Sequence, residues 1–304
     1  MEKPRLAVEL ALLLLLSTLW GASYSFIKIG VETIPPLSFI AARTALAGAV
    51  LYAVLRGRGL RLPADRATWR AFLLQACLNS AVPFTLIAWA ETRLGAGLAV
   101  ILNATTPIFA FLMAAATGRH PSGGVLRGVG VACGLIGTGL VVGTEALSAD
   151  AFATPSAVLA PLAILLATAC YAGAALFGAR FAGLDPMLPA CGSLLCGTVL
   201  LAPLALVVDR PWTLSPSPAS LAALAALALA CTALAFVLYF RLLRTLGPVG
   251  ATAQAYLRVP IGVGISLVFL NEALAPTAWL GLIAVVVGVA AMTAPRVWPA
   301  PTRR

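Results

Sequence analysis

The chain has 304 residues, of which 61% are hydrophobic and only 10% are charged, and its mean hydropathy is +1.01. A soluble domain carries roughly 25% charged residues, so this composition excludes a water-facing globule and makes lipid the expected surroundings. The formal net charge of +10 matches the excess of Lys and Arg that membrane proteins place at their cytoplasmic ends, and no nucleic-acid partner is expected.

Apolar segments follow one another along the chain, separated by charged or Pro/Gly-rich breaks. A helix needs about 20 apolar residues to cross a bilayer. The first segment lacks the small residues of a signal-peptide cleavage site, because Leu19 and Trp20 stand there, so an uncleaved helix is expected. The pattern predicts ten spanning helices, at residues 7–27, 36–55, 70–90, 96–117, 125–143, 157–178, 187–208, 219–240, 249–270 and 276–294.

Basic residues divide unequally between the two sides that ten spans create. With the N-terminus inside, fifteen Lys and Arg lie inside, three lie outside (Lys28, Arg93 and Arg210), and Arg43 and Arg258 lie within spans. Loops rich in Lys and Arg face the cytoplasm. We therefore expect a multi-pass membrane protein with both termini cytoplasmic.

The second half of the chain repeats features of the first half. Pro107 recurs as Pro260, and Gly128 recurs as Gly281, each after 153 residues. If each half crosses the bilayer five times, the second half enters from the opposite side, as in inverted-repeat transporters, whose site lies between the repeats near the midplane. Two five-helix domains are expected, residues 1–150 and residues 151–304.

Polar and aromatic residues follow one face of the first helix. Ser17, Trp20, Tyr24 and Lys28 are spaced by three or four residues, so they share that face. Trp20 and Tyr24 would lie deeper than the interface where such residues usually gather. The pattern favours a cavity wall that stacks on an apolar substrate, and packing between helices is the alternative.

Prolines inside the third and fourth helices follow polar residues. Pro83 comes four residues after Asn79, and Pro107 four residues after Asn103. A proline within a span frees a backbone carbonyl, which polar neighbours or a substrate can satisfy. We expect Pro83 and Pro107 to be hinges and both asparagines to face the cavity; kinks that serve packing alone are the alternative.

The ninth helix repeats the proline pattern, with Tyr256 four residues before the hinge Pro260 and with Gln254 and Arg258 on one polar face. Charge inside a membrane is costly and marks function by default. A guanidinium at position 258 could hold a substrate carboxylate. Arg43, the other basic residue within a span, is expected to have mainly a structural role.

Acidic residues are expected to avoid the membrane interior, and Glu9, one turn in from the cytoplasm, comes nearest to it. Transport would then be uncoupled, or coupled by another group. An intramembrane enzyme needs a nucleophile with a base, or metal ligands, at depth. The single histidine, His120, lies in a loop, and the six cysteines form no C-x-x-C pair. We expect no enzyme activity, no disulfide, no metal and no cofactor.

Glycines recur in the fifth and tenth helices, where Gly130 and Gly134 have the small-xxx-small spacing and Gly281 and Gly288 lie in the partner helix. Such residues let helices approach closely. We expect these two helices to be scaffold in a monomer; a dimer face is the alternative.

Several motifs together resemble the EamA domain of the drug/metabolite transporter superfamily. They are Trp20–Ser23, Lys28 and Gly30, Pro35–Phe39, Arg43, and the stretch from Leu94 to Pro107. The resemblance implies two inverted five-helix units that export small metabolites, and it is nearest to the YddG-type exporters of aromatic amino acids. The acidic residue that often follows the fourth helix of this domain is present as Glu272, but residues 118–120 read Gly-Arg-His in the first half.

Together these features predict an exporter that works by alternating access. Its substrate would be a small molecule, first of all an aromatic or hydrophobic amino acid. Amphipathic drugs or other metabolites in the same fold, and a channel, are the alternatives. The expected binding residues are Trp20, Tyr24, Asn79, Asn103, Tyr256 and Arg258.

Overall fold

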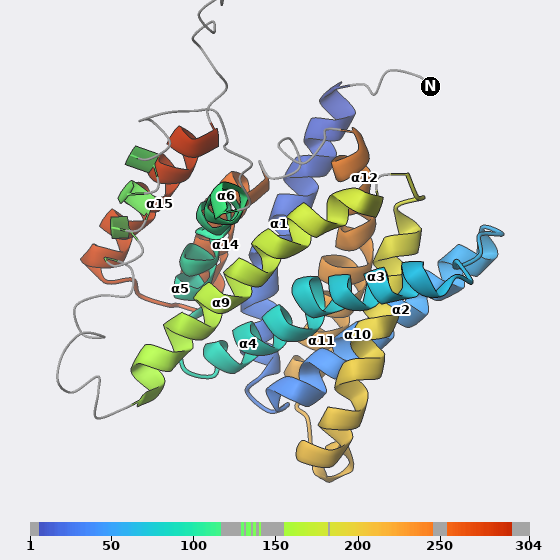
Figure 1. Cartoon of the computed structure of the whole chain (residues 1–304). Coiled ribbons are helices and arrows are strands. Elements are labelled where there is room, and N and C mark those ends of the chain that lie inside the picture. Colours follow the sequence, from blue (N-terminus) through green and yellow to red (C-terminus); the bar gives the residue numbers. More distant parts are fainter. Residues whose placement is uncertain are drawn as a thin grey trace, which may run out of the picture.

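The computed structural model describes residues 6–116, 129–130, 132–134, 136–137, 140, 155–181, 183–245 and 254–293. Regular structure in these residues is entirely helical, which confirms the all-helical class (Figure 1). The helices of the first half are α1 (Leu6–Gly30), α2 (Pro36–Gly57), α3 (Arg66–Ala76), α4 (Val82–Glu91), α5 (Ala96–Asn103) and α6 (Thr106–Ala116). The helices of the second half are α9 (Pro155–Gly178), α10 (Met187–Val208), α11 (Pro218–Ala228), α12 (Ala235–Thr245), α14 (Gln254–Phe269) and α15 (Pro276–Thr293).

Six helical stretches in the described residues are long and apolar enough to cross a membrane. They are Ala7–Gly30, Pro36–Gly57, Arg66–Glu91, Val158–Phe181, Met187–Val208 and Pro218–Leu242. Shorter apolar helices cover Ala96–Ala110, Leu257–Phe269 and Pro276–Gly288. Nine of the ten expected segments overlap these helices, and the fifth, 125–143, falls largely outside the described residues. The number of spans and the inversion of the halves stay predictions.

In the described residues, each half contains one π-helical segment inside a long helix. The segment η1 (Cys77–Ala81) joins α3 to α4, and η5 (Leu229–Leu234) joins α11 to α12. The second begins 152 residues after the first, within one residue of the 153-residue offset of the sequence repeat. Pro83 follows the first segment and cannot donate a backbone hydrogen bond, whereas Ala235 follows the second. Short π-helical stretches inside α-helices are frequent at functional sites.

The fourth predicted helix, 96–117, is broken rather than merely kinked. The α-helical pattern stops at Asn103 and resumes at Thr106, one residue before Pro107. The hydroxyl of Thr105 donates to the Leu102 carbonyl over 2.7 Å, and that of Thr106 donates to the Asn103 carbonyl over 2.8 Å. The Leu102 carbonyl also accepts the backbone N–H of Thr105 over 3.2 Å. The Thr106 hydroxyl pairs the Asn103 carbonyl, to which Pro107 has no N–H to offer, and this makes the break tolerable in an apolar interior.

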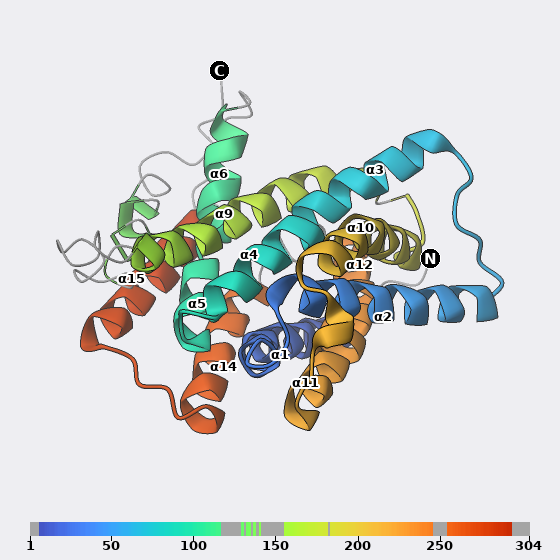
Figure 2. The ribbon, with the colours of Figure 1, turned by 90° about the horizontal axis from the view of Figure 1, so that it is seen from below.

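Helix α1 lies at the centre of the described bundle, between α14 on one side and α11 and α12 on the other (Figures 1 and 2). It packs most closely on α14, where Gly21 meets Gly262. A Cβ at Gly21 would lie 3.1 Å from the Gly262 backbone nitrogen and 3.1 Å from the Arg258 carbonyl oxygen. Around this pair, α2 packs along α10 and α4 along α9. Helices of the first half thus pack directly on helices of the second half.

Helix α15 packs against the described residues of the glycine-rich stretch 129–140. A Cβ at Gly288 would lie 2.6 Å from the Gly130 carbonyl oxygen and 2.7 Å from the Gly134 nitrogen, and one at Gly137 would lie 2.7 Å from the Val285 nitrogen. Both approaches are to backbone, which cannot move aside. These glycines therefore serve contact within the chain.

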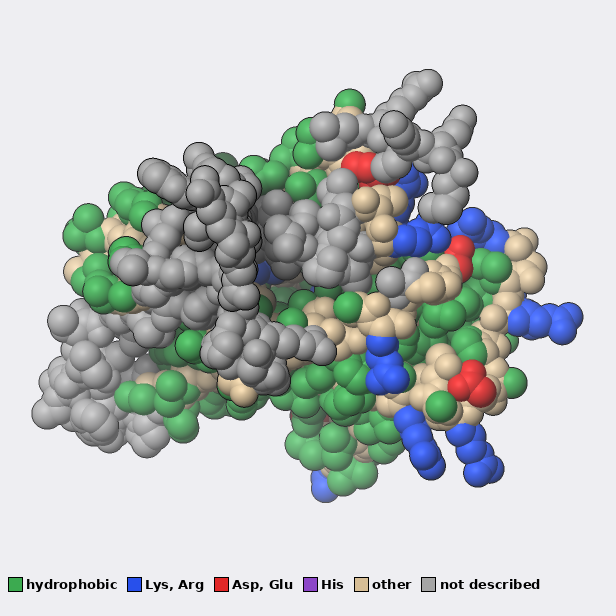
Figure 3. All heavy atoms as spheres, turned by 45° about the horizontal axis from the view of Figure 1, so that its top comes forward, with side chains coloured by type: hydrophobic (Ala, Val, Ile, Leu, Met, Phe, Trp, Pro, Cys, Tyr) green, Lys and Arg blue, Asp and Glu red, His purple; other side chains and the backbone are tan. Residues whose placement is uncertain are grey.

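Basic side chains gather at the end of the bundle where α2 ends and α3 begins, and we call this end the basic end. Figure 3 shows Lys and Arg on this part of the surface. The described ones are Arg56, Arg58, Arg61, Arg66, Arg70, Arg180, Arg241 and Arg244. Asp65 starts α3 there by accepting a 2.7 Å bond from the backbone N–H of Thr68, which lowers the pKa of its carboxyl. At the opposite end, hereafter the far end, the basic residues are Lys28, Arg93 and Arg210.

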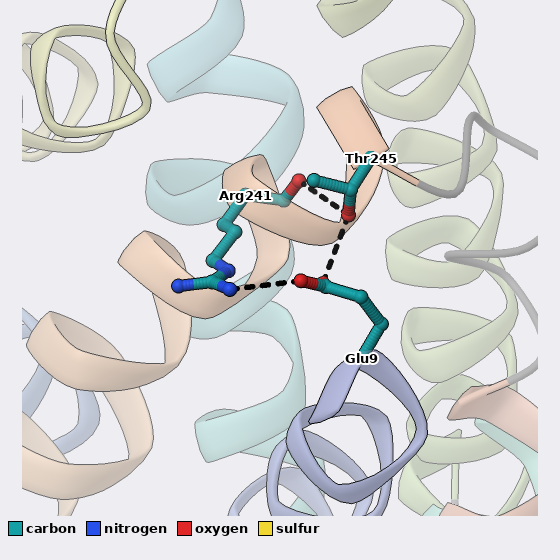
Figure 4. Close-up of polar contacts among 3 residues, drawn as sticks. All are labelled: Glu9, Arg241 and Thr245. Carbon is teal, nitrogen blue, oxygen red and sulfur yellow. Dashed lines mark hydrogen bonds and ion pairs between the residues drawn. The ribbon is translucent and has the colours of Figure 1, made fainter. Parts of the chain in front are cut away.

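One ion pair of the described residues joins the two halves at the basic end (Figure 4). Glu9 of α1 accepts a 2.8 Å bond from Nη2 of Arg241 and a 2.9 Å bond from the hydroxyl of Thr245, both on α12. The Glu9 side chain is buried, whereas that of Arg241 is 44% exposed. The acid that sequence placed nearest to the membrane interior therefore has its partners in the second half.

Candidate substrate cavity

A cavity of about 120 Å³ lies between helices of both halves, beside the middle of α1. Its walls come from α1, α2, η1, α4, α6, α9, α12 and α14. The lining residues are Trp20, Ser23, Tyr24, Ile27, Arg43, Asn79, Phe84, Ile87, Thr106, Ala110, Tyr171, Ala172, Ala175, Phe236, Tyr239, Gln254 and Arg258.

Four of the expected binding residues line this cavity: Trp20, Tyr24, Asn79 and Arg258. Asn103 is fully buried behind the wall and reaches the cavity only through Arg258. The side chain of Tyr256 lies outside the described residues. The expected face of α1 therefore lies at the cavity. Asn103, which was expected to bind substrate directly, instead supports Arg258.

Arg258 is held in place from the first half of the chain. Its Nη2 donates a 2.7 Å hydrogen bond to Oδ1 of Asn103, the last residue of α5. The Arg258 side chain is 7% exposed and its Nε has no partner among the described residues. A buried guanidinium with an unused donor at a cavity wall is suited to bind an anion, because a charge-assisted bond would satisfy it.

Arg43, expected to be mainly structural, both lines the cavity and holds two helices together. Its Nε donates a 2.7 Å bond to the hydroxyl of Thr232 in η5, and its guanidinium carbon lies 3.6 Å from the centre of the Phe84 ring. Thr232 in turn donates to the Leu227 carbonyl five residues back. The face of the Phe84 ring and the Thr232 hydroxyl thus stabilise the positive charge of Arg43. This guanidinium adds a second positive group to the cavity.

Six aromatic rings line the cavity, and sequence reasoning missed several of them. Phe84 lies 6.3 Å from Phe236 and 6.5 Å from Tyr171 between ring centres, while Trp20 lies 5.4 Å from Tyr239. Such tilted contacts are favourable arrangements for rings. One signal was present in the sequence: Phe84 and Phe236 are separated by 152 residues, within one residue of the repeat offset of 153.

The polar atoms left free at the cavity suggest what it can hold. Nδ2 of Asn79 and Nε of Arg258 are unused donors, and Oε1 of Gln254 is an unused acceptor, within the described part of the chain. None of the lining residues is acidic. A buried polar atom without a partner is unfavourable, so a ligand with an anionic group and a smaller donor beside an apolar body would complete this wall.

The hinge residues lie in different settings. Pro83 lies two residues after the end of η1, in the first turn of α4. The side chain of Pro107 lies outside the described residues, although its backbone belongs to the first turn of α6, next to the break. Helix α14 continues through Pro260 without a break. The structure therefore shows an interruption near two of the three prolines.

At the far end, a set of contacts between α1, the α4–α5 connection and Glu272 forms what we call the far-end seam. The Glu272 carboxylate accepts bonds of 2.7 Å from the Ala96 N–H and 2.9 Å from the Gly97 N–H, at the start of α5. Lys28 donates to the carbonyls of Glu91 at 2.8 Å and Leu94 at 2.9 Å. An anion at a helix start and a cation at a helix end both agree with the helix dipoles.

Further bonds between the halves lie at the same end. Asp209, which follows α10, accepts a 2.7 Å bond from the Ser38 N–H of α2, and the Ser220 hydroxyl of α11 donates over 2.8 Å to the Ile29 carbonyl of α1. Together with the far-end seam, these bonds join the two halves of the chain at the far end.

Comparison with known proteins places this fold and cavity in a family. A family model described as "EamA-like transporter family" matches residues 8–143 and again residues 158–294. The chain belongs to the EamA-like transporter family. It is therefore a membrane transporter, and the two matches cover most of each half.

Similar proteins support this assignment. The chain is 29% identical over 276 residues to YedA, an uncharacterized inner membrane transporter of Escherichia coli K12, covering 90% of this chain and 87% of YedA. It is 27% identical over 263 residues to a probable terminal-alkyne amino-acid exporter of Streptantibioticus cattleyicolor, covering 86% and 85% of the two chains. One solved crystal structure superposes with a TM-score of 0.64 at 18% identity, over 94% of this chain and 97% of that one; it shares the fold.

Proposed function

We propose that this transporter exports amino acids with aromatic or hydrophobic side chains across a bacterial inner membrane. The observation that carries the proposal is the pairing of the Arg258 guanidinium, held by Asn103, with the ring of Trp20 in one cavity. The guanidinium suits an α-carboxylate, and the rings suit an apolar side chain. The amino-acid exporter of Streptantibioticus cattleyicolor and the YddG-type resemblance support the same substrate class.

Two further features argue for amino acids over other small molecules. Oε1 of Gln254 is a free acceptor on the same turn as Arg258, so it could receive an α-ammonium beside the bound carboxylate. Lipophilic cations would need an acidic partner, and the lining contains none. Sugar phosphates carry two negative charges and several hydroxyls, which a mostly aromatic wall does not match.

Alternating access is the proposed mechanism, with the basic end in the cytoplasm, both termini inside and ten spans in two inverted units, residues 1–150 and 151–304. The far-end seam then closes the outer side, while the lining extends through Ala175, in the last turn of α9, and Gln254, the first residue of α14, toward the cytoplasm. The conformation described here would load substrate from inside. The interruptions near Pro83 and Pro107, together with Pro260, would let the helices rock.

The test is exchange of labelled phenylalanine or tryptophan in proteoliposomes of the purified protein. Exchange should exceed that of protein-free liposomes. Arg258→Gln should weaken the apparent affinity by about tenfold or more, because a charged hydrogen bond is worth roughly 1.5–3 kcal/mol. The matched control is Arg210→Gln, which alters an exposed arginine at the far end. Movement no faster than in protein-free liposomes would rule out this substrate class.

Phenylethylamine provides a second check, since it keeps the ring and the amine but has no carboxylate. It should compete with phenylalanine far less well in the wild type, and the difference between the two competitors should shrink in Arg258→Gln. Equal competition in the wild type would exclude a carboxylate site at Arg258.

A further inference from the structure

Five acidic side chains are buried or half-buried near helix ends in the described residues, and four of them have hydrogen-bond partners. Asp185 and Asp209 accept bonds from the backbone N–H groups of Met187 and Ser38. Glu9 is bonded by Arg241 and Thr245, and Glu272 is bonded by two backbone N–H groups of α5. Glu91 differs. It is the last residue of α4, its exposed fraction is 0%, and neither of its carboxyl oxygens has a hydrogen-bond partner among the described residues.

The nearest amine does not neutralise this carboxyl. Lys28 directs its Nζ to the backbone carbonyls of Glu91 and Leu94, and it forms no ion pair with the Glu91 side chain within the described residues. The charged groups that act on Glu91 from the surrounding elements are Lys28 of α1, Arg43 of α2 and Glu272 beyond α14. Arg43 is occupied by Thr232 and Phe84, and Glu272 carries a like charge.

An ionised carboxylate without hydrogen bonds is strongly disfavoured in a dry interior, whereas the protonated acid is tolerated there far better. We propose that Glu91 is the proton-binding group of the transport cycle, neutral while the far end is closed and the cavity holds no substrate. This inference rests on the proposed function, because it supplies the coupling group for that transport. The sequence had suggested no such group, since Glu91 falls at the predicted end of a span.

The position of Glu91 suits this task. It lies at the far-end seam, because its own carbonyl and the connection that follows it are bonded by Lys28. It also shares a helix face with Ile87, four residues earlier, and Ile87 lines the cavity. Glu91 therefore stands between the cavity and the outer side.

This placement gives a cycle in which a proton and a substrate move in opposite directions. When the seam opens, substrate leaves and the Glu91 carboxylate takes a proton from the outer solution. The seam then closes over the neutral acid. Loading of the next substrate from the cytoplasm accompanies loss of the proton toward the cavity, so one proton enters for each substrate exported.

The first experiment measures protonation without any substrate. The infrared spectrum of the purified wild-type protein near neutral pH should contain the carbonyl band of a protonated carboxylic acid that is missing in Glu91→Gln. Glu32→Gln, which alters an exposed acid in the neighbouring α1–α2 connection at the far end, should leave the band in place. Absence of the band from the wild type, or its persistence in Glu91→Gln, would overturn the proposal whatever the protein transports.

The second experiment measures coupling in proteoliposomes oriented for export. The lumen of these proteoliposomes represents the cytoplasm. An acidic exterior should speed net export by the wild type and by Glu32→Gln, and a pH-sensitive dye in the lumen should report that the lumen becomes more acidic. Glu91→Gln should still exchange labelled for unlabelled phenylalanine but should lose both the acceleration and the acidification. Exchange by wild type without a response to the pH gradient would defeat the coupling proposal and leave the transport proposal standing. Absence of exchange would defeat the transport proposal, and the infrared band would still decide whether Glu91 carries a proton.

Discussion

Nη2 of Arg258 donates a hydrogen bond to Oδ1 of Asn103 over 2.7 Å, and it joins the second half of the chain to the first beside the cavity. The two residues lie on α14 and at the end of α5, where the fourth predicted helix is broken. The break therefore affects more than helix shape, because it ends α5 at the side chain that fixes the direction of the guanidinium.

Replacing Asn103 by Ala should weaken substrate binding although Asn103 does not line the cavity. Loss of the bond would leave Arg258 free to turn from the carboxylate position, and we expect the apparent affinity for phenylalanine to fall about tenfold, the effect of roughly 1.4 kcal/mol. Ligand-induced thermal shifts measure this change. The control is Gln75→Leu, which alters a buried amide outside the cavity. Equal losses in the two variants would point to general destabilisation.

Trp20→Ala should reduce the response to aromatic ligands more than the response to leucine. The Trp20 ring forms one wall of the cavity and contacts Tyr239, and a ring stacked on a ligand ring contributes about 0.5–1.5 kcal/mol beyond the buried area. Thermal-shift titrations with phenylalanine, tryptophan and leucine give the comparison. Trp212→Ala removes a 70% exposed tryptophan at the far end and should change none of them. An unchanged phenylalanine response in Trp20→Ala would remove this residue from the site.

Glu272→Ala should open the far end. The carboxylate caps the start of α5 through two N–H groups, and loss of such a cap costs about 0.5–2 kcal/mol, enough to shift a two-state equilibrium by about twofold to thirtyfold. A single cysteine at Leu94 should react correspondingly faster with a membrane-impermeant thiol reagent added on the far side. The same cysteine combined with Glu32→Ala provides the control, and an unchanged rate in Glu272→Ala would show that the cap does not hold the seam.

Gly288→Ala should lower the stability of the protein, and those molecules of the variant that fold should bind substrate with unchanged affinity. The added Cβ would fall 2.6 Å from the Gly130 carbonyl oxygen, so α15 must move away, and overpacking of this kind costs about 1–3 kcal/mol. Gly264→Ala is the matched control, because a Cβ at Gly264 meets nothing within 4 Å and alanine favours helix over glycine. A melting temperature for Gly288→Ala equal to that of Gly264→Ala would contradict this packing.

Helix positions could be predicted because an apolar run of spanning length leaves few alternatives in lipid. The interruptions could not. Pro107 indicated a disturbance of the fourth helix, but the break also depends on the hydroxyl of Thr106, which satisfies the Asn103 carbonyl that Pro107 leaves without a donor. The π-helical segment η5 contains no proline, so no residue within it indicated that the helix would change there.

The cavity could be predicted only on the side where one helix carries a distinctive pattern. The spacing of Trp20 and Tyr24 was visible along α1, whereas Tyr171, Phe236 and Tyr239 lie in strongly apolar helices, where a ring equally suits lipid or core. The position of these rings depends on how α9 and α12 pack against helices of the first half. The periodicity of residues within one helix carries no information about that packing. The burial of Glu91 could not be predicted for a related reason. Only the folded far-end seam shows that the end of α4 is shielded from water.

The two π-helical segments have a consequence for the direction of the rings beyond them. Each residue of an α-helix advances by about 100° around the axis, so an extra residue accommodated in a wider turn rotates everything that follows. Phe84 and Phe236 come shortly after η1 and η5 and face each other at 6.3 Å. Deleting one residue from either segment would restore an ordinary turn and swing the following ring toward a different neighbour. The meeting of these two rings therefore depends on the backbone hydrogen bonds of η1 and η5, which come before either ring in the chain.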